Sequence, residues 1–243
     1  MADNTKNQSP FTRPGFIAAA LVVAVIVIAG IVVGGLKGTG HRAPASSPAP
    51  SSPAAASSSA GSPDVSVCGL KGTTLSGSVT SAPPVDEWQY QGTTAYPVSH
   101  SAGPGRTDTT GVRTCFQHSP AGAVFAAANA VAQGTDSGTA HAWLNYFVTG
   151  PARDDFLSTS SGTSTVAGAR VQITGFRLLS YDAAAATVDM AVRGSSAGQS
   201  VDLSMVYQLV WESGDWKLTV ADASTPIDVA TLPALTGYIL WGV

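Results

Sequence analysis

Residues that build metal and redox sites are scarce in this sequence. Its 243 residues include two cysteines, four histidines and three methionines. The two cysteines, Cys68 and Cys115, form no CxxC pattern, and no two histidines have the spacing of a zinc site. We therefore expect neither a metal site nor a cofactor.

Charged residues are also few, at 11% of the chain. From Asp64 to Val243 there are eight Lys and Arg residues against fourteen Asp and Glu residues, a net charge of −6. Binding to nucleic acid requires clustered positive charge that neutralises phosphates. The composition therefore argues against a nucleic-acid partner for this part of the chain.

The sequence does contain one long apolar run. Phe16 to Leu36 is a stretch of 21 residues without a charge, a proline or an asparagine. A helix of that length rises about 30 Å, which is enough to cross a bilayer core, whereas a cleaved secretory signal has a shorter apolar region. We predict a retained transmembrane helix at residues 16–36, inserted in the lipid bilayer after a cytoplasmic tail at residues 1–15.

Residues 37–63 are rich in Pro, Ser and Ala and contain almost no large apolar side chain. Such a segment cannot offset its ordering entropy by burial, so we predict a disordered linker. Basic residues flank the apolar run evenly, and the orientation therefore rests on the long linker and the separated cysteines, which suit an exported domain. We expect the carboxy-terminal domain on the extracytoplasmic side of the cell membrane.

The chain has an even number of cysteines, Cys68 and Cys115, and both lie in a domain predicted to be exported. This indicates one disulfide. The bridge would close a segment rich in Gly, Ser, Thr and Pro within residues 64–118. In the chain-entropy treatment, closing a loop of this length removes about 4 kcal/mol of unfolded-state entropy. We predict a loop-rich segment at residues 64–118 that depends on this structural disulfide.

A folded region at residues 119–243 begins with helical patterns. Ser119 offers an N-cap, and apolar residues at helical spacing follow until Gly134. A second helix is predicted from about Thr139 to Gly150, and Pro151 can start a short third one.

After Ala169 the apolar residues alternate, which is typical of strands. Gly175 interrupts the parity of the first strand and predicts a bulge. A hairpin near Ser213 is expected to place Trp211 and Trp216 opposite each other in the core. A two-residue turn would pair two acidic side chains, so a four-residue loop, Glu212 to Asp215, is predicted instead. The expected fold class is α+β, with two or three helices packed on a curved antiparallel sheet in a cone-like domain.

From about Trp88 to its end, the chain resembles a family of uncharacterised actinobacterial single-pass proteins. The runs that carry the resemblance are Cys115–Pro120, Gly122–Ala123, Ala126–Asn129, Gly150–Asp154, Ile173–Arg177 and Trp211–Trp216. Members are typically associated with integrative conjugative elements. Their layout is similar to that of scaffold subunits of type IV secretion systems, whose outer domain has a nuclear transport factor two-like cone. The resemblance implies no catalytic residue, because the family has none assigned.

Catalysis by a cone fold would require an acid or base in the cavity, and the helical region offers Tyr146, His141, Asp154 and Asp155. Their spacing does not bring them together, since consecutive helical residues point about 100° apart. A G-x-S-x-G pattern is present around Ser196, but it lies between two alternating strands rather than between a strand and a helix. We predict that the protein is not an enzyme.

The apolar segment from Leu232 to Val243 is too short to span a membrane. It is interpreted either as a strap packed on the domain or as a tail that docks a partner. All features together predict a non-enzymatic, membrane-anchored scaffold or assembly subunit of a conjugative or type IV secretion-like envelope machine. Its partners would be other membrane or envelope proteins and copies of itself. The alternative is an extracytoplasmic module that binds a small ligand in an apolar pocket.

Overall fold

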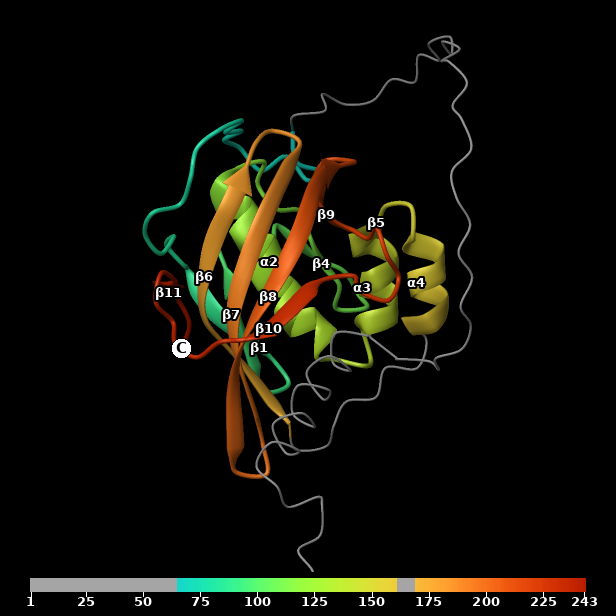
Figure 1. Ribbon diagram of the computed structural model, residues 1–243. Helices are drawn as coiled ribbons and strands as arrows, with labels where there is room; N and C mark the ends of the chain where they lie inside the picture. Colours follow the sequence, from blue (N-terminus) through green and yellow to red (C-terminus); the bar gives the residue numbers. More distant parts are fainter. Residues whose placement is uncertain (1–64, 161–168) are drawn as a thin grey trace, which may run out of the picture.

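The computed structural model describes residues 65–160 and 169–243 of the chain (Figure 1). Within these ranges the chain forms three helices and eleven strands, so it is rich in β-structure. In chain order the elements are β1 (Glu87–Gln91), β2 (Thr94–Val98), β3 (Arg106–Thr107), β4 (Arg113–Thr114), α2 (Pro120–Gly134), α3 (Ala140–Phe147), β5 (Val148–Thr149), α4 (Arg153–Thr159), β6 (Arg170–Tyr181), β7 (Ala185–Ser196), β8 (Gln199–Glu212), β9 (Asp215–Thr219), β10 (Asp228–Thr231) and β11 (Ile239–Leu240).

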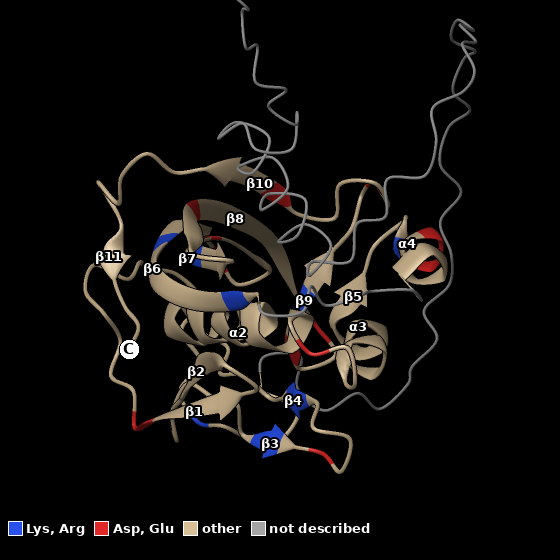
Figure 2. Cartoon of the chain, turned by 90° about the horizontal axis from the view of Figure 1, so that it is seen from below, with Lys and Arg blue, Asp and Glu red and all other residues tan. Residues whose placement is uncertain are grey.

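The main sheet has seven strands. Six of them follow the order β11-β6-β7-β8-β9-β5, and β10 pairs with β8 outside this path. Every pair is antiparallel except β5 and β9, which are parallel. The chain leaves β10 on one side of the sheet and reaches β11 at the opposite edge (Figure 2).

Helix α2 is the central element of the packing. Thirteen of its fifteen residues are buried, because the main sheet lies on one side of it and the β1–β2 hairpin on the other (Figure 2). On the hairpin side, Asn129 Nδ2 donates to Pro97 O at 3.1 Å. A helix that is buried on all sides is apolar all round, and small alanines allow both layers to approach it closely.

Several sequence predictions about single elements are confirmed. Helix α2 begins after Ser119, whose Oγ accepts from Gly122 N at 3.0 Å, and it ends at Gly134. The pairing of β6 with β7 shifts register between Ile173 and Gly175, as a bulge at that glycine requires. The structure also contains the predicted disulfide between Cys68 and Cys115.

The predicted membrane anchor requires a correction. The apolar run and the linker, residues 16–36 and 37–63, lie outside the described residues. In the described ranges, none of the helices has both the length and the apolar character needed to cross a membrane. Single-pass anchoring, and the extracytoplasmic location deduced from it, therefore lack support. That prediction rested on the length and composition of one apolar run alone.

The predicted cone of helices on a sheet is wrong as well. Only α2 packs broadly on the main sheet, whereas the short α3 and α4 lie beside its β9–β5 end (Figure 1). Strands β5, β10 and β11 have two to four residues, and segments this short carry no readable alternation. The result is a β-rich domain with one buried helix rather than a helical layer over a sheet.

The turn between β8 and β9 also differs from the prediction. Glu212 pairs directly with Asp215, and the two-residue turn between them has positive φ angles of 55° at Ser213 and 76° at Gly214. Such angles are typical of a tight hairpin turn. The two acidic side chains do not repel each other at the surface, because Asp215 is fully buried while Glu212 is exposed. Trp211 and Trp216 do face each other, with ring centroids 5.2 Å apart.

The carboxy-terminal segment packs on the domain. Trp241 is 7% exposed and makes edge-to-face contacts with Trp88, Phe125 and Phe176, at centroid distances of 5.1–5.5 Å. These contacts join the segment to β1, α2 and β6. The interpretation of this segment as a packed strap is thereby confirmed.

Replacing Trp241 with alanine should lower the free energy of unfolding by about 3–5 kcal/mol, because it empties a site between three aromatic rings. Urea unfolding followed by circular dichroism measures the change. Leu240→Ala is the matched control, since Leu240 is 66% exposed and should change stability by less than about 0.5 kcal/mol. Equal stability of both variants would contradict the packing role.

Candidate functional site

The most unusual polar group in the described residues is the carboxylate of Asp215, at the first position of β9. It is fully buried, and it accepts from two successive backbone amides: Cys115 N at 2.6 Å and Phe116 N at 2.9 Å. Cys115 has a φ of 69°, in the left-handed region. This conformation turns consecutive N–H groups toward one side and creates a concave anion site. Asp215 occupies that site from 100 residues further along the chain.

Two side chains complete the arrangement. From α3, Tyr146 donates its hydroxyl to Asp215 Oδ2 at 2.7 Å. From β9, Lys217 donates its Nζ to Tyr146 O at 2.9 Å and lies 3.0 Å from the centre of the Tyr146 ring. We refer to Asp215, Tyr146 and Lys217 as the Asp215 cluster.

Burial dominates the electrostatics of this cluster. It raises the pKa of Asp215, against the opposing effect of hydrogen bonds from Tyr146, Phe116 and Cys115. Burial and the negative charge of Asp215 also raise the pKa of Tyr146. The amine of Lys217 has its pKa lowered to about 8, again by burial. Tyr146 therefore remains a neutral donor at physiological pH, and both oxygens of Asp215 are bound by donors of the protein itself.

Of the residues proposed from sequence as acids or bases, only Tyr146 belongs to this cluster. His141 is exposed and its ring lies beside Asn145, with Nδ1 and Asn145 Nδ2 3.2 Å apart. Asp154 and Asp155 are exposed in the first turn of α4, where Asp154 pairs with Arg153 at 3.0 Å. The structure does not bring these groups together.

Ser196, the serine of the G-x-S-x-G pattern, ends β7 at a hairpin turn, as its position between two strands predicted. Sequence reasoning missed Asp215, because it assigned this residue to a four-residue loop, Glu212 to Asp215, rather than to the first position of β9. The signal that could have revealed it is the Ser213–Gly214 pair, which favours a tight turn and so aligns Asp215 with Glu212.

A second buried carboxylate, Asp189 on β7, lies on the face of the sheet that the carboxy-terminal segment crosses. It is fully buried and pairs with Arg177 Nη2 at 2.5 Å. It also accepts from Tyr238 Oη and Ser204 Oγ, each at 2.7 Å. Successive side chains of a strand point to opposite faces, so Asp189 lies on the face opposite Val188 and Met190, where the Tyr238 hydroxyl donates to it.

A buried arginine links α2 to the segments on its other side. Arg113 is 4% exposed, and its Nε donates to Asn129 Oδ1 at 2.7 Å. Its Nη2 donates to Gln91 Oε1 at 2.7 Å, and its guanidinium stacks on the Tyr96 ring at 3.7 Å. Burial lowers the pKa of Arg113 to about 10. These contacts satisfy the buried cation with amide oxygens and an aromatic face.

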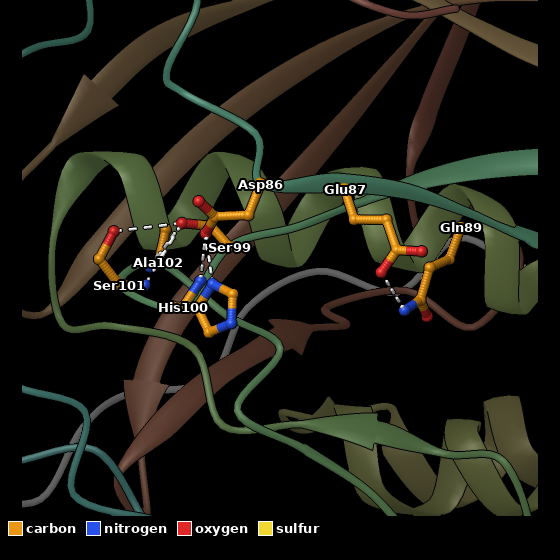
Figure 3. A network of polar contacts seen from close by, with 7 residues as sticks. All are labelled: Asp86, Glu87, Gln89, Ser99, His100, Ser101 and Ala102. Atoms are coloured by element: carbon orange, nitrogen blue, oxygen red, sulfur yellow. Dashed lines mark hydrogen bonds and ion pairs between the residues drawn. The ribbon is translucent and has the colours of Figure 1, made fainter.

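At the surface, Asp86 and His100 form an exposed pair (Figure 3). Asp86 Oδ2 accepts from the backbone N of His100 at 2.7 Å and lies 2.9 Å from its Nδ1. Ser99 Oγ accepts from the amides of Ser101 and Ala102 in the same turn. These local bonds shape the loop after β2, and the backbone bond to His100 lowers the pKa of Asp86.

Two hollows of different character lie next to the main sheet. An apolar cavity of about 40 Å³ has space for roughly one or two water molecules. It is lined by residues of α2, α3, β8 and β9 and of the chain before β10, among them Val131, Trp143, Met205, Tyr207, Leu218 and Ile227. A groove of about 240 Å³ with a mixed lining is formed by polar residues, among them Tyr90, Thr93, Arg170, Gln172, Arg193 and Ser195, and by the apolar Ala95, Val171 and Val243.

Replacing Asp215 with alanine should lower the free energy of unfolding by about 3–5 kcal/mol, because it leaves two buried amides and a tyrosine hydroxyl without an acceptor. Chemical denaturation measures the loss. Glu212→Ala, at the directly paired but exposed position, should change stability by less than about 0.5 kcal/mol. A D215A variant that loses less than about 1 kcal/mol of unfolding free energy would contradict this role, because water would then satisfy the amides in place of the carboxylate.

The lowered pKa of Lys217 predicts a rise of stability with pH. Between about pH 8 and the ordinary lysine pKa of 10.5, the unfolded chain binds a proton that the folded protein does not. Lys217 should therefore contribute a rise of up to about 2 kcal/mol in the free energy of unfolding from pH 8 to pH 10, opposed near pH 10 by buried tyrosines such as Tyr146 and Tyr207, whose pKa values are raised. Lys217→Met should remove this slope, whereas the exposed Lys71→Met should keep it. Identical slopes in wild type and K217M would refute the assignment.

No curated protein and no solved structure matches the chain significantly. The sequence matches a family described as "Domain of unknown function (DUF8175)" over residues 47–240, which covers the greater part of the chain, including all its described helices and strands. The protein is therefore a member of the DUF8175 family.

Proposed function

We propose that this protein is a non-enzymatic assembly subunit that binds other proteins through its β-rich domain. The observation that carries the proposal is that its buried charged side chains are held by hydrogen-bond partners within the same chain. Asp215 and Asp189 accept hydrogen bonds on both carboxylate oxygens, and Arg113 donates from Nε and Nη2, in each case with partners in the same chain. Groups bound in this way stabilise a rigid scaffold and are not poised for a substrate.

The groove of mixed lining supports a protein partner. Tyr90 is 64% exposed at its rim, and the exposed Arg170 lies on the same groove. Tyrosine and arginine are enriched at protein interfaces and at their energetic centres. The apolar cavity of about 40 Å³, in contrast, is far smaller than the several hundred Å³ of a typical ligand pocket, which weighs against the small-ligand alternative.

Because the chain resembles proteins of integrative conjugative elements, we propose that the assembly it joins is a conjugative or type IV secretion-like machine. Deleting the gene should reduce conjugal transfer at least about tenfold, and the wild-type gene should restore it. The double variant Tyr90→Ala with Arg170→Ala should restore it poorly while keeping the wild-type melting temperature, because both side chains are exposed. Lys71→Ala is the surface control and should restore transfer fully.

Two results would contradict parts of the proposal. Normal transfer in the deletion strain would end the assignment to conjugation. Full complementation by the double variant would exclude the groove as the partner surface.

A further inference from the structure

The first described residues, 65–78, form a strap that lies across the β8–β9 end of the domain (Figure 1). Eleven of these fourteen residues are exposed, and only Ser66 is buried. The strap therefore contributes almost no apolar burial to hold itself in place. Residues that bury so little surface do not offset their loss of conformational entropy.

Single hydrogen bonds along the strap connect it to the domain. Val67 N donates to Gly214 O at 2.7 Å, and Thr74 N donates to His118 O at 2.8 Å. Lys71 O accepts from the side chain of Gln117 at 2.6 Å. Each such bond contributes little net stability, because water replaces it when the strap detaches.

The strongest attachment of the strap is the disulfide. Cys68 belongs to the strap, and Cys115 belongs to the domain, where its backbone amide binds Asp215. The Cys115 sulfur is fully enclosed, whereas Cys68 is partly exposed. Two donors of the strap face the Cys115 sulfur: Cys68 N at 3.2 Å and Ser66 Oγ at 3.5 Å.

Beneath and beside the strap lies a group of rings. His118 stacks on Trp211 at a centroid distance of 4.0 Å, and Trp216 contacts both Trp211 and Tyr181. The strap meets this group directly, because Tyr181 Oη and His118 O both bond to the backbone of Thr74. Detaching the strap therefore changes the surface around the rings at this end of the domain.

We infer that the Cys68–Cys115 disulfide is a thiol-controlled clasp: the oxidised pair holds residues 65–78 on the β8–β9 end, and reduction releases them while the rest of the domain stays folded. The reductant is a dithiol. Its thiolate attacks Cys68 Sγ, the more exposed sulfur, and the electron pair of the S–S bond passes to Cys115 Sγ, which takes up a proton.

The second thiolate of the dithiol then breaks the mixed disulfide, and Cys68 Sγ takes up a proton. In total, the pair gains two electrons and two protons, and the dithiol becomes a disulfide. The core remains intact because α2 and strands β6 to β9 bury their apolar side chains without any contribution from the strap.

Limited trypsin digestion tests the clasp, because Lys71 lies in the strap. In the oxidised full-length protein, cleavage after Lys71 should be slow. Treatment with dithiothreitol, or the Cys68→Ser variant, should accelerate it by about tenfold or more, since proteolysis follows the population of the detached state. Cleavage after Arg193 in β7 serves as the internal control and should not change.

Hydrogen exchange supplies the second measurement. Reduction should remove the protection of the Val67 and Thr74 amides and leave the amides of β7 and β8 protected. Gln117→Ala, with the disulfide intact, should accelerate cleavage after Lys71 by less than about threefold, because it removes only one exposed hydrogen bond to the strap. Unchanged cleavage after reduction would overturn the clasp. Loss of protection throughout β7 and β8 would overturn it too, since the bridge would then stabilise the whole domain.

Discussion

Burial of α2 on all sides is the constraint on which the rest of the fold depends. The helix lies between the main sheet and the β1–β2 hairpin, so neither layer can form its core without it. Its alanines permit close approach, and its two polar residues, Asn129 and Gln133, have to be satisfied inside the protein. Arg113 meets that requirement through its side chain and its backbone amide, and it thereby fixes β4 against the helix.

Buried charges connect parts of the chain that are distant in sequence. Asp215 links the hairpin after β8 to the segment after β4 and to α3. Asp189 links the sheet to the carboxy-terminal segment that contains Tyr238. Each carboxylate is held by several donors, which offsets the cost of its desolvation. The same hydrogen bonds fix the positions of both carboxylates within the domain.

The long helix and strands were predictable from sequence. Short strands, and contacts between residues that are distant in sequence, were not. Ser119 and Gly134 mark the ends of α2, and alternation reveals β7 and β8, because these patterns are local. The strands β5, β10 and β11 exist only through pairing with distant partners. Asp215 was misplaced because its burial depends on two amides 100 residues away, which no local pattern encodes. The disulfide was predictable because the chain has two cysteines. The predicted anchor rested only on the length of one apolar run, and the predicted cone rested only on the order of helices and strands along the chain.

The position of α2 also limits how this domain can change over evolutionary time. A side chain enlarged on one face of the helix pushes against the sheet, and one enlarged on another face pushes against the hairpin. Close-packed interiors respond poorly to added volume, so drift along α2 is expected to occur through paired exchanges that conserve volume across the three layers. Members of the family should therefore vary in the exposed loops and strap while keeping a helix of small residues at this place.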